Sequence, residues 1–79
     1  LSNATLAGAI LLFADLSEAD LTQATLTDAD LSWTNLSRAD FSNAILRGAT
    51  LAWANVHDAN LTDVNLEGVD MRGVELPAP

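Results

Sequence analysis

Apolar residues recur at every fifth position along the chain. Sixteen positions five residues apart, from Leu1 to Leu76, are all apolar. A second apolar series lies two residues before each of them, from Ala4 to Val74, and holds alanine or valine everywhere except Thr34. We expect the larger residues of this pattern to form the core: Leu16, Leu21, Leu26, Leu31, Leu36, Phe41, Leu46, Leu51, Val56, Leu61 and Leu66.

This period excludes an α-helix. A step of five residues turns a helix by about 500°, so successive leucines would drift by ~140° around its surface. The two inward positions are two residues apart, as on one face of a strand. Three outward residues then separate them from the next pair. The pattern therefore predicts a short extended segment, a corner and a repeat of both, which is a solenoid.

The position directly before each leucine is mostly Asp or Asn, as in the segments ADLSE, ADLTQ and ANLTD. The nine Asp or Asn residues at this position are Asp15, Asp20, Asp30, Asn35, Asp40, Asn55, Asn60, Asn65 and Asp70. This A(D/N)Lxx pattern resembles the pentapeptide-repeat family over essentially the whole chain. The resemblance implies an all-β fold, a right-handed quadrilateral β-helix of about four coils of twenty residues. Residues 1–79 would form one such domain.

The glycines support the twenty-residue coil independently. Gly8, Gly48 and Gly68 share one column at this spacing, with Asp28 in the gap. A type II turn needs a positive φ at its second central residue, which Gly supplies and Asp tolerates. We therefore predict type II corners in this column. In the column of Phe13, Trp33 and Trp53 we predict another turn type, because bulky residues resist positive φ.

The aromatic column is the first candidate for a functional surface. Residues twenty apart are neighbours at about 4.8 Å on stacked coils. Phe13, Trp33 and Trp53 would therefore stack along one edge, and Ile10 and Leu12 extend the apolar surface at its N-terminal end. The column has two readings. It stabilises neighbouring coils, or it forms an interaction strip for a protein partner or a second copy.

Eleven acidic residues face three arginines, which gives a net charge of −8. Such a surface repels nucleic acid and anionic membranes, so we expect neither as a partner and favour a basic one. In the predicted columns every arginine has an acidic neighbour. The expected pairs are Arg38 with Glu18 and Asp58, Arg47 with Glu67, and Arg72 with Asp70.

The sequence argues against catalysis. The chain has no cysteine and a single histidine, His57, predicted to lie outward beside Asp58. A metal site or a hydrolase needs further ligands or an oriented buried base, and the convex prism offers no pocket. We predict no enzyme activity, no cofactor and no metal. The chain shows no signal peptide or transmembrane segment, which leaves the compartment open and slightly favours the cytoplasm.

The two ends of the stack are predicted to differ. At the C-terminal end, Val64, Val69 and Val74 replace alanine and Met71 replaces leucine, which adds volume to close the core. Pro77 and Pro79 would then stop ladder pairing. At the N-terminal end we expect an open coil that is covered by a second copy or by a preceding partner module.

These observations predict a non-catalytic protein-interaction or scaffold module. The resemblance supplies an alternative, because some members of the family are acidic DNA mimics that bind type II topoisomerases such as gyrase. Eight net charges on a stack of ~19 Å give one per ~2.4 Å, against one per ~1.7 Å in duplex DNA. However, a turn of DNA is about 34 Å long. The chain also lacks the protruding loops and the C-terminal dimerisation segment of those members, so the interaction module is favoured.

Overall fold

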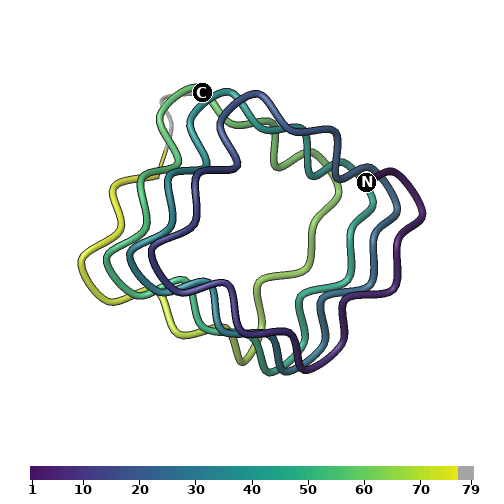
Figure 1. Cartoon of the computed structure of the whole chain (residues 1–79), viewed down its shortest axis with the longest axis horizontal. Helices are drawn as coiled ribbons and strands as arrows, with labels where there is room; N and C mark the ends of the chain where they lie inside the picture. Colours follow the sequence, from purple (N-terminus) through teal and green to yellow (C-terminus); the bar gives the residue numbers. More distant parts are fainter. Residues whose placement is uncertain (77–79) are drawn as a thin grey trace.

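The computed structural model describes residues 1–76 as a stack of four-sided coils. Seen along the stack, the coils superpose as a ring whose corners project outward (Figure 1). Residues 1–76 contain no helix and no continuous strand; each side is a single β-bridge. The bridges are parallel and join residues twenty apart: Thr5–Thr25, Ile10–Asp30, Asp15–Asn35, Asp20–Asp40, Thr25–Ile45, Asp30–Thr50, Asn35–Asn55, Asp40–Asn60, Ile45–Asn65 and Thr50–Asp70. The twenty-residue coil and its register are therefore as predicted.

All corners use one kind of turn. In a typical corner the N–H of Ala4 donates to the carbonyl of Leu1 at 2.9 Å, which closes a four-residue turn. The second central residue has a φ between 57° and 76° at every corner from residue 3 to residue 73. The first central residues do not have positive φ. This combination is the signature of a type II turn.

The turn type predicted for the aromatic column is wrong. Phe13, Trp33 and Trp53 have φ values of 64°, 60° and 62°, so they adopt the same left-handed conformation as the glycines. The left-handed region costs a non-glycine residue roughly 1–2 kcal/mol. The ladder offsets this cost, because the strained residue also bonds to the next coil. For example, the N–H of Trp33 donates to the carbonyl of Ala52 at 2.9 Å.

The structure explains why Asp or Asn precedes the leucine. In each of the nine cases, Oδ1 of this side chain accepts the N–H of the residue two positions later, which is the first central residue of the turn. Asp20 and Thr22 are joined in this way at 3.0 Å. The side chain therefore caps a corner as an Asx turn, and the A(D/N)L motif is a turn signal.

The core occupies the two middle coils. The leucine-type residues from Leu21 to Val56 are buried, as is Thr34, whose hydroxyl donates to the carbonyl of Leu11 at 3.0 Å. Three residues expected in the core, Leu16, Leu61 and Leu66, are only partly buried. They belong to the end coils, where one side of each core residue has no covering coil among residues 1–76.

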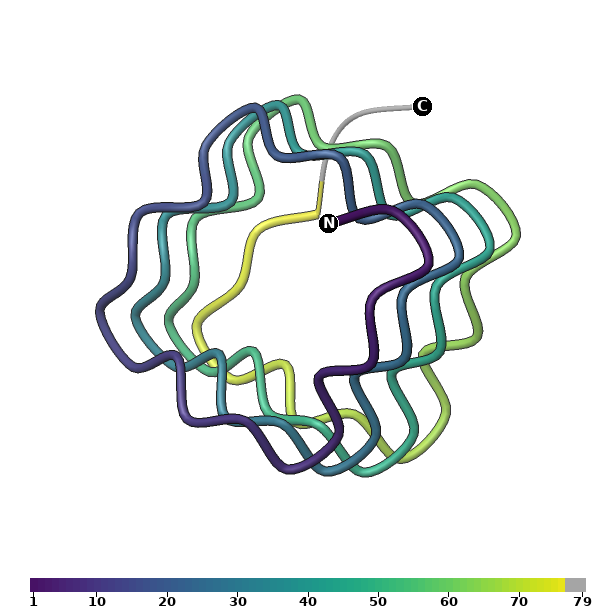
Figure 2. The same ribbon diagram turned by 45° about the vertical axis from the view of Figure 1, so that its right-hand side comes forward.

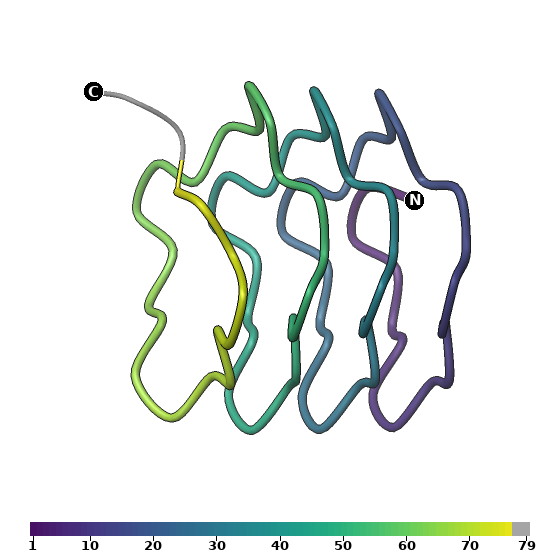
Figure 3. The same cartoon turned by 90° about the vertical axis from the view of Figure 1, so that its left-hand side faces the viewer.

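The first coil is firmly attached to the second. The first and last coils lie at opposite ends of the stack (Figure 2 and Figure 3). The N–H groups of Leu6, Leu11 and Leu16 donate to carbonyls of the second coil at 2.7, 2.8 and 2.8 Å. The second coil returns bonds of its own, for example from the N–H of Asp30 to the carbonyl of Ala9 at 2.8 Å. Each side of the first coil is therefore bonded.

The last coil is attached less completely. On one side, Leu51 and Trp53 donate to the carbonyls of Asp70 and Arg72 at 2.8 and 2.7 Å. On the next side Ile45 and Asn65 still form a parallel bridge, but within residues 1–76 Leu46 forms no short, well-aligned backbone hydrogen bond of the kind seen elsewhere in the stack. A surface hollow of about 610 Å³ lies along this side and is lined by residues of both coils, among them Ile45, Arg47 and Glu67.

The predicted seal of the C-terminal end is therefore not found in residues 1–76. Val64, Val69, Met71 and Val74 are partly exposed, to a similar degree as the inward residues of the first coil. Valine is larger than the alanine of the inner coils, and we predict that it keeps the last coil from lying flush. Pro77 and Pro79 fall outside the described residues.

Candidate interaction surface

The apolar residues singled out in the sequence lie together along one corner. We call Ile10, Leu12, Phe13, Trp33 and Trp53 the aromatic strip. Ile10 is 80% exposed, Phe13 69%, Trp33 53%, Trp53 52% and Leu12 45%. Soluble surfaces rarely leave large apolar side chains contiguous, and such a patch is typical of a binding site.

The rings of the strip form an ordered stack. The ring centroids of Phe13 and Trp33 are 6.3 Å apart with 20° between the ring planes, and those of Trp33 and Trp53 are 5.6 Å apart with 16° between them. The next position in the column is Gly73. A Cβ atom at Gly73 would overlap the indole of Trp53, so this glycine gives the last ring the space that it occupies.

Carboxylates lie on both sides of the strip. Asp15 lies two residues after Phe13, and Asp30 lies three residues before Trp33. Each accepts hydrogen bonds at its own turn, from Ser17 and from Ser32, and these bonds lower the pKa of both carboxyl groups. Both therefore stay ionised at neutral pH, and the strip has one carboxylate on each side, Asp15 in the first coil and Asp30 in the second.

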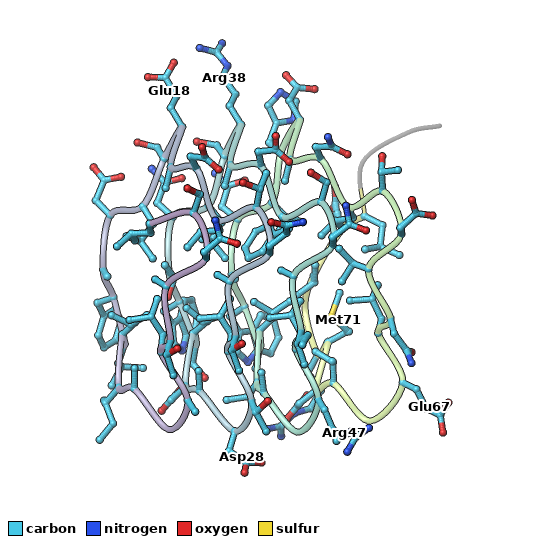
Figure 4. All side chains as sticks on the ribbon, turned by 90° about the vertical axis from the view of Figure 1, so that its right-hand side faces the viewer. Glu18, Asp28, Arg38, Arg47, Glu67 and Met71 are labelled. Carbon is cyan, nitrogen blue, oxygen red and sulfur yellow. The ribbon has the colours of Figure 1, made fainter. Side chains whose placement is uncertain are left out.

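The predicted arginine pairs are only partly present. Arg38 lies beside Glu18 with 3.8 Å between Nη1 and Oε1 (Figure 4), and Arg72 binds Asp70 at 2.9 Å. Within residues 1–76, no ion pair joins Arg38 to Asp58 or Arg47 to Glu67. Arg47 and Glu67 project from the edge that also carries Asp28, whereas Met71 points inward (Figure 4). Stacking by twenty residues places side chains as neighbours but does not by itself bring their charges into contact.

The remaining titratable groups do not converge. Nε2 of His57 lies 3.3 Å from Oδ2 of Asp58, and both side chains are exposed. Among residues 1–76, no three His, Cys, Asp or Glu side chains are placed to hold a metal ion. The same residues include no helix long and apolar enough to cross a membrane.

Two features of this surface were missed by sequence reasoning. One is Gly73, which was assigned no role although it stands in the aromatic column. Its position twenty residues after Trp53 was a usable signal. The other is the pair of flanking carboxylates, Asp15 and Asp30. The sequence gives their positions two or three residues from a ring. Only the structure shows that the corner projects and that the two carboxylates lie on opposite sides of it.

The repeats and the fold of this chain match known proteins. The family model of pentapeptide repeats, in eight copies, matches residues 1–38, 24–63 and 34–73. The chain belongs to the pentapeptide-repeat family. Its coils are therefore those of the right-handed quadrilateral β-helix that the resemblance to this family implied.

Two solved structures of this family resemble the chain closely. The pentapeptide-repeat protein Rfr23 from the cyanobacterium Cyanothece 51142 is 40% identical, with a TM-score of 0.94 over 99% of this chain and 52% of its own. HetL from Nostoc sp. strain PCC 7120, which is involved in the regulation of heterocyst differentiation, is 40% identical. Its TM-score is 0.91 over 95% of this chain and 35% of its own. The chain thus spans about half and about a third of these two proteins.

A more distant structure shares only the fold. The plasmid-mediated fluoroquinolone resistance protein QnrB1 is 23% identical, with a TM-score of 0.53 over 85% of this chain and 37% of its own. No curated protein matches the chain.

Proposed function

We propose that this β-helix is a non-catalytic protein-interaction module and that the aromatic strip is its contact surface. The supporting observation is the exposure of five large apolar side chains in one contiguous strip on a protein with a net charge of −8. Aromatic residues are enriched in protein interfaces, where they supply most of the binding energy. HetL, at 40% identity, is involved in regulation, a role of the kind that a binding module serves.

The partner is either a different protein or a second copy of this chain. A second copy could use the strip itself or the edge of the N-terminal coil. On that edge the N–H groups of Thr5, Ile10 and Asp15 donate to no backbone carbonyl within residues 1–76, and an unpaired ladder edge favours association.

The first experiment separates these partners. Sedimentation velocity of the wild-type chain and of Trp33→Ala/Trp53→Ala over a wide concentration range reports self-association through the strip. Capture of proteins from an extract of the cells that produce the chain, with the same two proteins as bait, reports a different partner. Asn43→Ala, on another corner, is the matched control.

The interaction role predicts that at least one of the two assays loses its signal in the double variant and keeps it in Asn43→Ala. If both assays gave the same result for all three proteins, the strip would not be the contact surface. It would then serve only to stabilise neighbouring coils.

The second candidate function is DNA mimicry toward a type II topoisomerase such as gyrase. Its support is charge density: the stack is 19 Å long along its shortest axis, so eight net charges give about one per 2.4 Å, close to duplex DNA. A DNA supercoiling assay with gyrase at micromolar protein tests it. If the chain neither inhibited gyrase nor protected it from a quinolone, this function would be excluded for the chain.

A further inference from the structure

We propose that the aromatic strip binds a basic amphipathic α-helix, with apolar residues facing the rings and lysine or arginine on both flanks. This proposal rests on the proposed interaction role of the strip and names its partner. It is carried by three properties of the strip: the orientation of the rings, their spacing and the charges beside them.

The ring orientation favours an apolar contact at the crest of the ridge. Phe13, Trp33 and Trp53 stack with 16–20° between neighbouring planes, so the faces of the middle ring are turned toward its neighbours. Trp53 leans over Gly73 with its other face. The edges of Trp33 and Trp53 therefore point to solvent, whereas a cation binds over a ring face. Leucine-like side chains that pack against and between these edges suit the crest better than an arginine does.

The ring spacing favours a helix over an extended strand. The centroids are 6.3 and 5.6 Å apart along the ridge. In an α-helix, residues four apart rise by about 6.0 Å, so one apolar residue per turn meets each interval of the stack. In a strand, residues on one side recur every 6.4–6.8 Å, and the mismatch grows from ring to ring.

The flanking charges define the sides of the helix. Asp15 lies on one side of the strip and Asp30 on the other, and neither forms an ion pair with an arginine within residues 1–76. Arg72 at the C-terminal end of the column is held by Asp70 at 2.9 Å. A basic residue on each flank of the partner helix would meet one carboxylate, Asp15 or Asp30, and the net charge of −8 would steer the encounter.

The test uses a synthetic probe. A fifteen-residue peptide carries leucine at three positions, each four residues apart, with lysine on both flanks, and a control peptide of the same composition has its leucines dispersed around the helix. Titration calorimetry of the wild-type chain measures both affinities. Because Trp33 and Trp53 are the only tryptophans, their fluorescence reports whether the peptide lies on the strip. Circular dichroism reports whether the peptide becomes helical.

Two charge variants locate the contact. Asp15→Asn/Asp30→Asn removes the flanking charges, and asparagine keeps the turn because it caps the same kind of corner at Asn35 and Asn55. Asp28→Asn/Asp63→Asn removes the same number of charges from two other corners. We expect the first pair to weaken binding about fivefold and the second pair to change it less than twofold. Trp33→Ala/Trp53→Ala should weaken binding about tenfold or more.

Several results would overturn the proposal: equal affinity for the dispersed peptide, equal losses in the two charge variants, or binding without a gain in helix. A wild-type dimer that is lost in Trp33→Ala/Trp53→Ala would assign the strip to a second copy instead. Failure of the peptide test together with a strip-dependent capture from the cell extract would leave the interaction role standing and reject only the basic helix.

Discussion

The first and last coils of this solenoid differ in how completely they pack on their neighbours. Their sequences suggest that the last coil packs more completely than the first, but the structure shows the opposite. The first coil has the narrow alanine slots of the inner coils and is bonded on each side to its neighbour. The last coil carries valines and a methionine at its inward positions, yet it is bonded to the third coil on only part of its circumference. In this fold the match of a coil to its neighbour decides how it stacks, and added apolar volume does not improve it.

We attribute this difference to the side chains at the inward position two residues before each leucine. Alanine at positions such as Ala24 and Ala44 lets the backbones of adjacent coils approach to ladder distance around the ring. We predict that the larger side chains of Val64 and Val69 limit this approach, because a closely packed core yields little. Short backbone bonds to the last coil are present at Leu51 and Trp53 and absent at Leu46, although Ile45 and Asn65 still form a bridge.

The largest expected difference between regions concerns core truncation. Leu36→Ala in the buried middle of the stack should lower the free energy of unfolding by about 2–5 kcal/mol. Leu66→Ala in the partly exposed last coil should cost less than half as much, because fewer buried contacts are lost. Chemical denaturation of both variants measures the difference. Equal losses would mean that the last coil is as tightly packed as the core.

The second prediction concerns hydrogen exchange. Within residues 1–76 the amides of Leu46 and Gly48 form no short hydrogen bond to the last coil, whereas those of Leu26 and Asp28, one coil earlier, donate at 2.7 and 2.9 Å. We expect the first pair to exchange at least about a hundredfold faster than the second. Exchange followed by NMR measures each amide.

Val64→Ala/Val69→Ala serves as the control for the cause of this difference. If the valines keep the last coil from lying flush, the double variant should slow the exchange of Leu46 and Gly48 toward the rate of their counterparts. Unchanged exchange in the variant would show that the open side has another origin.

The third prediction tests the link between the aromatic strip and the last coil. Gly73→Ala places a Cβ atom where the indole of Trp53 lies, whereas a Cβ atom at Gly68 would meet no atom within 4 Å. Both glycines have positive φ, of 71° and 76°. Gly68→Ala should therefore cost only the conformational strain of about 1–2 kcal/mol.

Gly73→Ala should cost about 1 kcal/mol more than Gly68→Ala, because the ring must also move. It should also change the near-ultraviolet circular dichroism of the stacked tryptophans. Identical spectra and stabilities for the two variants would mean that Trp53 does not depend on the space above Gly73.

The smallest expected effect is acid sensitivity. Hydrogen bonds from the turn residues hold the pKa values of Asp15, Asp20, Asp30 and Asp70 below their usual range. A carboxyl group with a lowered folded pKa stabilises the fold above its unfolded pKa, about 3.9, and this stabilisation is lost as pH falls through the folded value.

Because three of these four carboxyl groups lie in the first two coils, Asp15→Asn/Asp20→Asn/Asp30→Asn should flatten the decrease in Tm between pH 5 and pH 3 more than Asp70→Asn does. Thermal denaturation at several pH values measures both. A triple variant with the wild-type acid profile would show that these caps add no pH-dependent stability.

The sequence by itself determined the repeat, the two inward positions and the columns on the surface. It could do so because a five-residue period is incompatible with a helix and because each pentad is folded by its own local signals, above all the Asp or Asn that caps the following turn. The aromatic strip was predictable for the same reason, since a column is a matter of counting once the coil has twenty residues.

Only the tertiary structure decided how neighbouring coils meet. Asp28 and Trp33 share the left-handed conformation of the glycines, and ladder bonds to both neighbouring coils hold these two corners in it. The contact of Arg38 with Glu18, the space that Gly73 leaves for Trp53 and the open side of the last coil likewise depend on packing between coils. These features are set by fractions of an ångström between stacked backbones, and a repeat pattern does not encode them.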